Sequence, residues 1–228
     1  MKQFDVMIIG AHPDDAFIGA GGLMLKMQKQ GLSVLVVTVT DGENQSGDFK
    51  TRSKEFFESV QLCGVQGHQM QYMDGWLQFH AEDLCADILK LMVEINPKII
   101  ITHSSCDQHT DHKIVANAVS SAIELMFHFL KNECRLKYLM AFPPIRLGID
   151  SLQSFTPMLL CDVTDYCKIK ESAVLVHSSQ MPYLELNLKK HIALNRFYGT
   201  LISSEYAEGY SYKHFENDVS IENILRAL

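Results

Sequence analysis

Residues 6–22 have the sequence VMIIGAHPDDAFIGAGG, and this stretch decides the fold. Its apolar run ends at Gly10, as a short buried strand does. Pro13 then fixes its own φ and biases His12 away from helical backbone, so the turn is sharp. His12 and Asp15 are three residues apart around this turn, so both side chains can point at one spot beyond the carboxyl end of the strand. A histidine and an aspartate that converge there suit a catalytic zinc site.

A simpler interpretation of the same turn needs no metal. An aspartate at the start of a helix often caps free backbone N–H groups, so Asp14 or Asp15 can serve only as a cap. His12 can be an ordinary polar loop residue, because short motifs produce false matches. The stretch alone therefore leaves both interpretations open.

Length and charge narrow the class of protein. The chain has 228 residues, which fits one large α/β domain over residues 1–228. Its formal net charge is −7 with no Lys/Arg cluster, so nucleic acid is not an expected partner. No uninterrupted apolar run reaches about 18 residues, so we expect no membrane span. The N-terminus has the pattern of a strand rather than of a signal peptide, because Asp5 interrupts it.

The cysteines indicate a reducing compartment. None of them forms a C-x-x-C pair, and most lie inside apolar stretches, where cysteine acts as a small buried hydrophobe. We therefore expect the protein to be cytoplasmic. The six are Cys63, Cys85, Cys106, Cys134, Cys161 and Cys167.

Strand and helix patterns alternate along the chain. Four strand–helix repeats predict a parallel sheet with right-handed crossovers. The expected fold is therefore α/β and Rossmann-like: three layers, with a mostly parallel sheet flanked by helices and the site at the carboxyl ends of the strands. The expected strands after the first are residues 32–40, 69–73, 98–103, 136–142 and 158–163, and the expected helices are 17–30, 51–63, 81–96, 113–130, 168–177 and 186–202.

The glycines of the first expected helix and the C-terminal tail each predict a specific structural feature. Gly19, Gly21 and Gly22 are costly inside a helix, so they predict a close approach of backbone to the sheet or to a ligand. The tail after Tyr206 is aromatic and charged, and we expect it to fold over the domain.

A second cluster of polar residues follows the strand expected at 98–103. The chain continues SSCDQHTDH over residues 104–112, immediately before a helix. His109 and His112 are three residues apart at the start of that helix, so they share one face. Loops after two parallel strands can meet at one edge of the sheet. One of these histidines would then complete a site of two nitrogen ligands and one oxygen ligand, with the open fourth position that a catalytic zinc needs.

The two clusters together resemble the PIG-L/LmbE-like family of zinc-dependent N-acetylglucosaminyl deacetylases. The main matches are the segments 11–15 (AHPDD), 19–22 (GAGG) and 109–112 (HTDH). Weaker matches run almost the full length: Asp41-Gly42-Glu43, Arg52 with Glu55, Lys170-x-x-Ala173 with His177-x-Ser179-Gln180, and Tyr206-Ala207-Glu208.

Two positions depart from the family pattern. Ala16 stands where the first motif usually continues with Glu, and Thr110 stands where the second motif usually has Pro. Neither change removes a residue that matches a ligand or the base. A missing outer carboxylate at position 16 would loosen the metal or the base, because outer-shell partners tune both.

The resemblance implies a metal site of His12, Asp15 and His112. Zinc is the expected ion, and Fe²⁺ or Co²⁺ fits the same ligand set. The expected activity is that of a zinc-dependent N-deacetylase, a hydrolase that cleaves a linear amide C–N bond in an N-acetylglucosamine-type sugar conjugate.

The resemblance also implies three catalytic residues. Asp14 is the expected general base, which takes a proton from the zinc-bound water and returns it to the leaving amine. His109, if protonated, would stabilise the tetrahedral oxyanion. Asp111 is expected to orient His109 and to raise its pKa.

Two further residues are candidates for substrate binding. Arg52 matches an arginine that follows the polar loop in the family, and the alternative is a surface ion pair with Glu55. His177 is the other candidate, although a lone histidine late in a helix is often a cap or a core residue.

Alternatives remain for the function as a whole. The chain could be a zinc amidase acting on another acyl group or a thiol conjugate, or a non-catalytic member that binds sugar or metal. A dinucleotide-binding enzyme is disfavoured, because no G-x-G-x-x-G follows the first strand. We also expect a homo-oligomer, because family members often form one.

Overall fold

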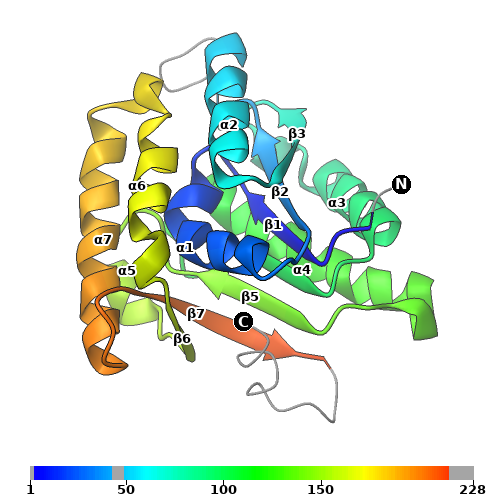
Figure 1. Ribbon diagram of the computed structural model, residues 1–228. Helices are drawn as coiled ribbons and strands as arrows, with labels where there is room; N and C mark the ends of the chain where they lie inside the picture. The colour runs from blue at the N-terminus through cyan, green and yellow to red at the C-terminus, as the bar shows by residue number, and fades with distance from the viewer. Residues whose placement is uncertain (1–2, 43–48, 216–228) are drawn as a thin grey trace.

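Seven strands form one sheet in the order β3-β2-β1-β4-β5-β7-β6. The computed structural model describes residues 3–42 and 49–215 (Figure 1). The first five strands in this order run parallel, and β7 runs antiparallel to both of its neighbours. The strands are β1 (Val6–Gly10), β2 (Val34–Thr40), β3 (Gln66–Tyr72), β4 (Ile99–His103), β5 (Tyr138–Phe142), β6 (Leu159–Asp162) and β7 (Ala207–His214).

Helices cover both faces of the sheet, so the molecule has three layers (Figure 1). The α-helices are α1 (Asp15–Lys29), α2 (Phe49–Cys63), α3 (Ala81–Ile95), α4 (Thr110–Leu130), α5 (Ile149–Ser154), α6 (Cys167–Leu175) and α7 (Tyr183–Leu201). Short 3-10 helices are η2 (Leu77–Phe79), η3 (Lys131–Glu133), η4 (Thr164–Tyr166) and η5 (Ser178–Gln180). The expected α/β architecture is confirmed.

The alternation of side chains along β1 explains the two separate cores. Val6 and Ile8 point to the face covered by α1, α2, α6 and α7. Met7 and Ile9 point to the face covered by α3 and α4. Because every residue of β1 is buried, the strand is apolar throughout rather than alternating.

The order in which successive strands are added to the sheet reverses between β1 and β4. The chain runs from β1 outward to β3 on one side, then returns to place β4 on the other side of β1. Ligands of open α/β sheets bind beyond the carboxyl ends of the strands at such a switch point. The loops after β1 and β4, which carry the two motifs, therefore emerge side by side.

The glycines of α1 allow close approach, as the sequence predicted. A Cβ at Gly19 would lie 2.5 Å from Cγ of Phe142, and a Cβ at Gly22 would lie 2.7 Å from Cβ of Val163. The helix also departs from helical geometry at Ala20, where φ is −138° and ψ is 17°. Glu208 accepts hydrogen bonds from the backbone N–H groups of Gly22 (2.9 Å) and Leu23 (2.8 Å), so the second half of α1 is capped from within the core.

The prediction for the C-terminal tail was wrong in its described part. Residues 207–214 do not fold over the domain but form β7, which inserts between β5 and β6. The buried Glu208 explains the position: one of its carboxylate oxygens lies 2.6 Å from Nζ of Lys170, and the other accepts the hydroxyl of Tyr210. The rest of the tail, residues 216–228, lies outside the described residues.

Among the described helices, one segment has the length and apolar composition that crossing a membrane requires, and it spans Thr110–Glu133. Core helices of globular proteins meet the same test. Val115, Val119 and Met126 of this segment are buried in the core under α3 and the sheet. The segment is therefore used in packing.

We predict that Gly19→Ala lowers the free energy of unfolding by about 1–3 kcal/mol, because the added methyl group overpacks against the ring of Phe142. Urea denaturation measures the change. The control is the double variant with Phe142→Leu, in which the same methyl group should cost much less. An equal cost in both backgrounds would contradict this contact.

Two buried histidines predict acid lability. Burial lowers the pKa of His177 to about 4, and burial followed by the charge of Lys170 lowers the pKa of His191 to about 4. Both are neutral in the folded chain, whereas the unfolded chain takes up a proton below about pH 6.5. The free energy of unfolding is therefore unaffected by these two histidines above about pH 6.5. It decreases as the pH falls from about 6.5 to 4, by at most about 1.4 kcal/mol per pH unit for each histidine.

Urea denaturation between pH 4 and 8 tests this expectation. His191 Nε2 lies 3.0 Å from the carbonyl oxygen of Ile145, so His191→Gln keeps a donor without the titrating ring. The variant should lose stability less steeply than the unchanged chain below pH 6.5. Identical slopes would show that His191 does not contribute.

Candidate active site

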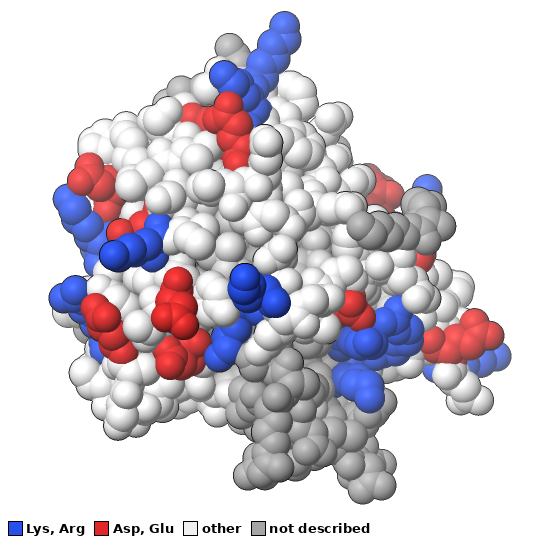
Figure 2. Space-filling view, viewed as in Figure 1, with Lys and Arg blue, Asp and Glu red and all other residues white. Residues whose placement is uncertain are grey.

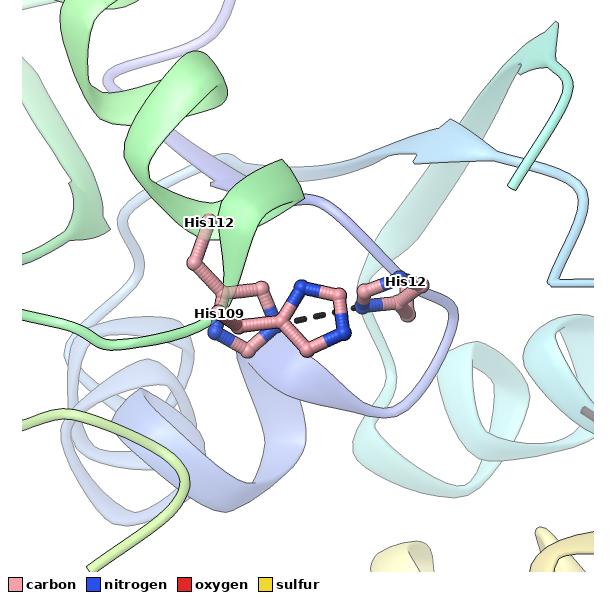
Figure 3. A group of neighbouring side chains, drawn as sticks. All are labelled: His12, His109 and His112. Atoms are coloured by element: carbon pink, nitrogen blue, oxygen red, sulfur yellow. Dashed lines mark hydrogen bonds between the residues drawn. The ribbon is translucent and has the colours of Figure 1, made fainter. Parts of the chain in front are cut away.

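The two motifs meet at the carboxyl edge of the sheet. His12 lies in the turn after β1, and Asp15 is the first residue of α1. The helix α4 begins three residues earlier than expected, so His109 is its N-cap and His112 lies in its first turn. Figure 3 shows the three histidine rings grouped together, two from the start of α4 and one from the loop after β1.

Three potential ligand atoms form a nearly equilateral triangle. His12 Nδ1 lies 3.1 Å from His112 Nε2 and 3.2 Å from Asp15 Oδ2, and the third side, from His112 Nε2 to Asp15 Oδ2, is 3.4 Å. Ligand atoms bound about 2.0–2.1 Å from a tetrahedral zinc lie about 3.3 Å apart. These three residues therefore fit one divalent ion and leave a fourth corner open.

The charges around the triangle favour a cation. Burial opposes charge on His112, but Asp15 and Asp107 outweigh it and raise the pKa of His112 to about 9. In the same way, burial opposes charge on His12 and on Asp15, but their mutual attraction prevails. It raises the pKa of His12 well above its usual value and, with His112 and His103, lowers that of Asp15. A divalent ion can supply the positive charge that these carboxylates attract.

Outer carboxylates hold the two histidines of the triangle. Asp107 Oδ2 lies 2.8 Å from His112 Nδ1, which leaves Nε2 for the triangle. Asp74 Oδ1 lies 3.1 Å from His12 Nε2, which leaves Nδ1. Such carboxylate–histidine pairs fix the ring orientation and raise the basicity of a metal ligand. Neither aspartate was predicted from the sequence.

His103 is a further residue of the site that was not predicted from the sequence. It ends β4, is buried, and stacks on the ring of His112 with centroids 4.0 Å apart. Its Nε2 accepts the backbone N–H of Ala11 at 2.9 Å and lies 3.2 Å from Asp15 Oδ2. Because that lone pair is already used, His103 supports the site rather than completing the triangle.

Asp111 contacts the ring of His109, but through its backbone, and the pKa of His109 is not raised as expected. The backbone N–H of Asp111, not its carboxylate, donates to His109 Nδ1 at 3.2 Å. The carboxylate instead accepts the N–H of Gly75 at 2.8 Å and lies 3.6 Å from His12 Nε2. Burial, then the charges of His112 and His12, lowers the pKa of His109 to about 4, so this ring is not raised toward protonation.

A hollow that is partly open to solvent lies over the triangle. Asp14 lines it, as do Arg146, Gln180 and Asn187 from the second half of the chain.

Arg52 also lines the hollow and is buried, with 2% of its surface exposed. Its NH2 lies 3.6 Å from Asp14 Oδ1, and its NH1 lies 3.8 Å from Glu55 Oε2. Gly42, at φ +69°, packs so closely that a Cβ there would lie 2.7 Å from Nε of this arginine. The surface ion pair considered from the sequence is thus a buried one.

His177 is not among the residues that line this hollow. It is buried beside Phe17, and its Nε2 lies 3.2 Å from the hydroxyl of Ser59. This environment is that of a core residue, the alternative that its sequence position left open.

The two departures from the family motifs have local structural contexts. Ala16 is buried in the apolar core that contains α1. Thr110 is exposed at the first position of α4, where proline is also favoured because its missing N–H is not needed.

Comparisons with known proteins identify the family and its relatives. Residues 7–123 match the family PIG-L, described as GlcNAc-PI de-N-acetylase. A diacetylchitobiose deacetylase from Thermococcus kodakarensis is 26% identical over 221 residues, which span 90% of this chain and 81% of the relative.

Two solved structures share the fold. The conserved protein TT1542 from Thermus thermophilus is 22% identical, with a TM-score of 0.82 over 96% of this chain and 98% of its own. GalB, a 4-carboxy-2-hydroxymuconate hydratase from Pseudomonas putida, is 17% identical, with a TM-score of 0.78 over 96% of this chain and 100% of its own. Because a hydratase shares it, this fold alone does not identify the reaction.

We predict that Asp107→Asn lowers zinc affinity about 10- to 100-fold, because the amide cannot accept all the hydrogen bonds that the carboxylate accepts from His112, His109 and Ile145. Competition with a chromophoric chelator measures the affinity. The exposed Asp165 offers the control, and Asp165→Asn should leave the affinity unchanged. Equal affinities of the two variants would show that Asp107 does not support a metal ligand.

Proposed function

The chain belongs to the PIG-L family, and on that premise we propose that it is a metal-dependent hydrolase that removes the N-acetyl group from an N-acetylglucosamine-type sugar conjugate. The triangle of His12, Asp15 and His112 beneath an open hollow is the observation that carries the proposal. The deacetylase named among its relatives supports this substrate class.

The proposed ion is zinc, and Fe²⁺ or Co²⁺ suits the same nitrogen and oxygen donors. When bound, the ion would lower the pKa of a water molecule and polarise the amide carbonyl of the substrate. His12, Asp15 and His112 are the proposed ligands, with Asp74 and Asp107 behind them.

Asp14 is the proposed general base. It lines the hollow beside the triangle, so its carboxylate lies close to where the reacting groups would sit. It would accept a proton from the attacking water and return it to the amine nitrogen as the C–N bond breaks. The products are acetate and the free amine. The guanidinium of Arg52, 3.6 Å from Oδ1, helps to hold this carboxylate in place.

His109 is the proposed donor to the oxyanion. Because its Nδ1 accepts the backbone N–H of Asp111, the neutral ring carries its proton on Nε2. The ring can therefore donate a hydrogen bond to the oxygen of the tetrahedral intermediate without being a cation. Asp111 is then a positioning residue that acts through its backbone and through His12.

The structure supports a substrate-binding role for Arg52 more than for His177. Arg52 lies in the hollow and stays our proposal for a sugar hydroxyl or phosphate. His177 is buried away from the hollow, so we propose for it only a supporting role beside Ser59.

The setting of the enzyme is also proposed. All six cysteines are free, which supports a reducing compartment and a cytoplasmic location. On the face shown in Figure 2, basic and acidic side chains are interspersed rather than gathered by sign, which supports a small-molecule substrate over nucleic acid. A homo-oligomer stays a prediction.

We predict that Asp14→Asn reduces acetate release at least about 100-fold, because the amide cannot accept the proton of water. Acetate is measured with a panel of N-acetylglucosamine conjugates, and zinc content is measured on the same samples. The zinc content should match that of the unchanged chain, because Asp14 is not a proposed ligand.

Full turnover by this variant with zinc bound would show that Asp14 is not the base. Zinc binding without acetate release from any conjugate, by the unchanged chain, would instead favour another acyl group, a thiol conjugate or a binding role. These outcomes separate the mechanism from the function.

A further inference from the structure

The hollow over the triangle is built from two parts of the chain. The proposed ligands, base and oxyanion donor all come from residues inside the family match, 7–123. Another wall comes from later residues, including Ile145 and Arg146 after β5 and Tyr183, Leu184 and Asn187 of α7. The proposed catalytic and metal-binding residues and the residues of this second wall therefore belong to separate segments of the chain. The second wall can determine which substrates bind.

Asn187 is the residue of this wall with an unused polar group. Only 3% of its surface is exposed, and its Nδ2 is buried without a hydrogen-bond partner. Burying an amide donor without a partner is unfavourable, so nearly all buried polar groups in folded proteins are paired. A rotation of the amide toward the hollow, which Asn187 lines, would let a ligand oxygen pair this donor.

Asn195, two turns further along α7, shows that the fold can satisfy an asparagine here. It is buried to a similar degree, with 4% of its surface exposed. With its amide in the orientation that suits its neighbours, it donates to the carbonyl oxygen of His191 and accepts from Nζ of Lys170, both at 3.2 Å. The unpaired amide of Asn187 is thus a property of the hollow and not of the helix.

Arg52 supplies the same kind of group from another wall of the hollow. Its Nε and NH1 are buried without hydrogen-bond partners. Guanidinium and amide nitrogens only donate, so both walls present donors. The matching ligand groups are acceptor oxygens, and sugar hydroxyls provide several of them.

We propose that Asn187 is a substrate-binding residue that donates from Nδ2 to a hydroxyl oxygen of the substrate's sugar ring. This inference rests on the proposed function, in which the acetamide carbonyl is directed to the metal and His109 and only the hydroxyls remain for the second wall. A site built to hydrogen-bond a hydroxyl discriminates strongly against analogues that lack it. Asn187 would therefore select among N-acetylated sugars.

The first test separates ligand binding from structural support. Asn187→Leu removes an unpaired donor and keeps the shape, so its melting temperature should equal or exceed that of the unchanged chain. The matched control is Asn195→Leu, which removes paired groups and should lower the melting temperature. A fall for Asn187→Leu as large as that for Asn195→Leu would overturn the proposal, since it would give Asn187 a structural role.

The second test measures binding without turnover. Isothermal titration with N-acetylglucosamine and its 3-, 4- and 6-deoxy analogues compares Asp14→Asn with the double variant Asp14→Asn/Asn187→Leu. The second substitution should weaken N-acetylglucosamine binding about 10-fold. For one deoxy analogue this loss should disappear, because the bonded hydroxyl is already missing. Asn187→Ala, which cannot clash, should repeat the pattern.

The outcomes distinguish the two proposals. If the unchanged chain releases acetate but the loss is the same for every analogue, or absent for all, Asn187 does not bind a hydroxyl and only this inference fails. If the unchanged chain neither binds these sugars nor releases acetate from any N-acetylated conjugate, the proposed function fails and this inference with it.

Discussion

The site depends on how the backbone of Ala11 is held between two strands. Its N–H donates to Nε2 of His103 at the end of β4, and its carbonyl oxygen accepts the N–H and the hydroxyl of Thr40 at the end of β2, both at 2.8 Å. Both neighbours of β1 thus fix the residue just before His12. Without this restraint the turn would be free to move, and His12 would not face His112, one hundred residues away.

Many ionisable side chains are buried at this edge of the sheet, among them Asp15, Asp107 and His112. Buried carboxylates and imidazoles are costly unless they are paired. Here His12 and His112 each have one nitrogen directed to an outer carboxylate and the other directed to the triangle. The arrangement is unfavourable for an apolar core but suited to a divalent cation. Burial of these charges without a cation lowers the stability of the fold, and a bound cation would offset that cost.

The sequence was sufficient for features set by local patterns. The apolar runs of β1, β2 and β4 predicted a parallel sheet, and the position of the two motifs after β1 and β4 predicted that His12, Asp15 and one of His109 and His112 meet at one edge. The choice of His112 came from the family resemblance. It was insufficient for contacts made across long separations. Asp74 follows β3, and its Asp-Gly pair is typical of any turn, so nothing local connected it to His12. His103 looks like the polar end of a strand, and Asn187 like one polar residue in a helix.

His177 shows the reverse error. A motif match placed it in the substrate site, whereas packing buries its side chain in the core. The strand β7 was missed because its pairing with β5 and β6 is fixed by Glu208 and its buried partners, which only the folded chain brings together.

The most direct test of the central claim is the X-ray absorption spectrum at the zinc edge of the protein loaded with one equivalent of zinc. We expect about four nitrogen or oxygen neighbours at about 2.0–2.1 Å, with the outer scattering of two imidazole rings and no sulfur. That result would agree with an ion bound by His12, Asp15 and His112. A sulfur neighbour at about 2.3 Å, the absence of imidazole scattering, or a failure to bind zinc would contradict the site.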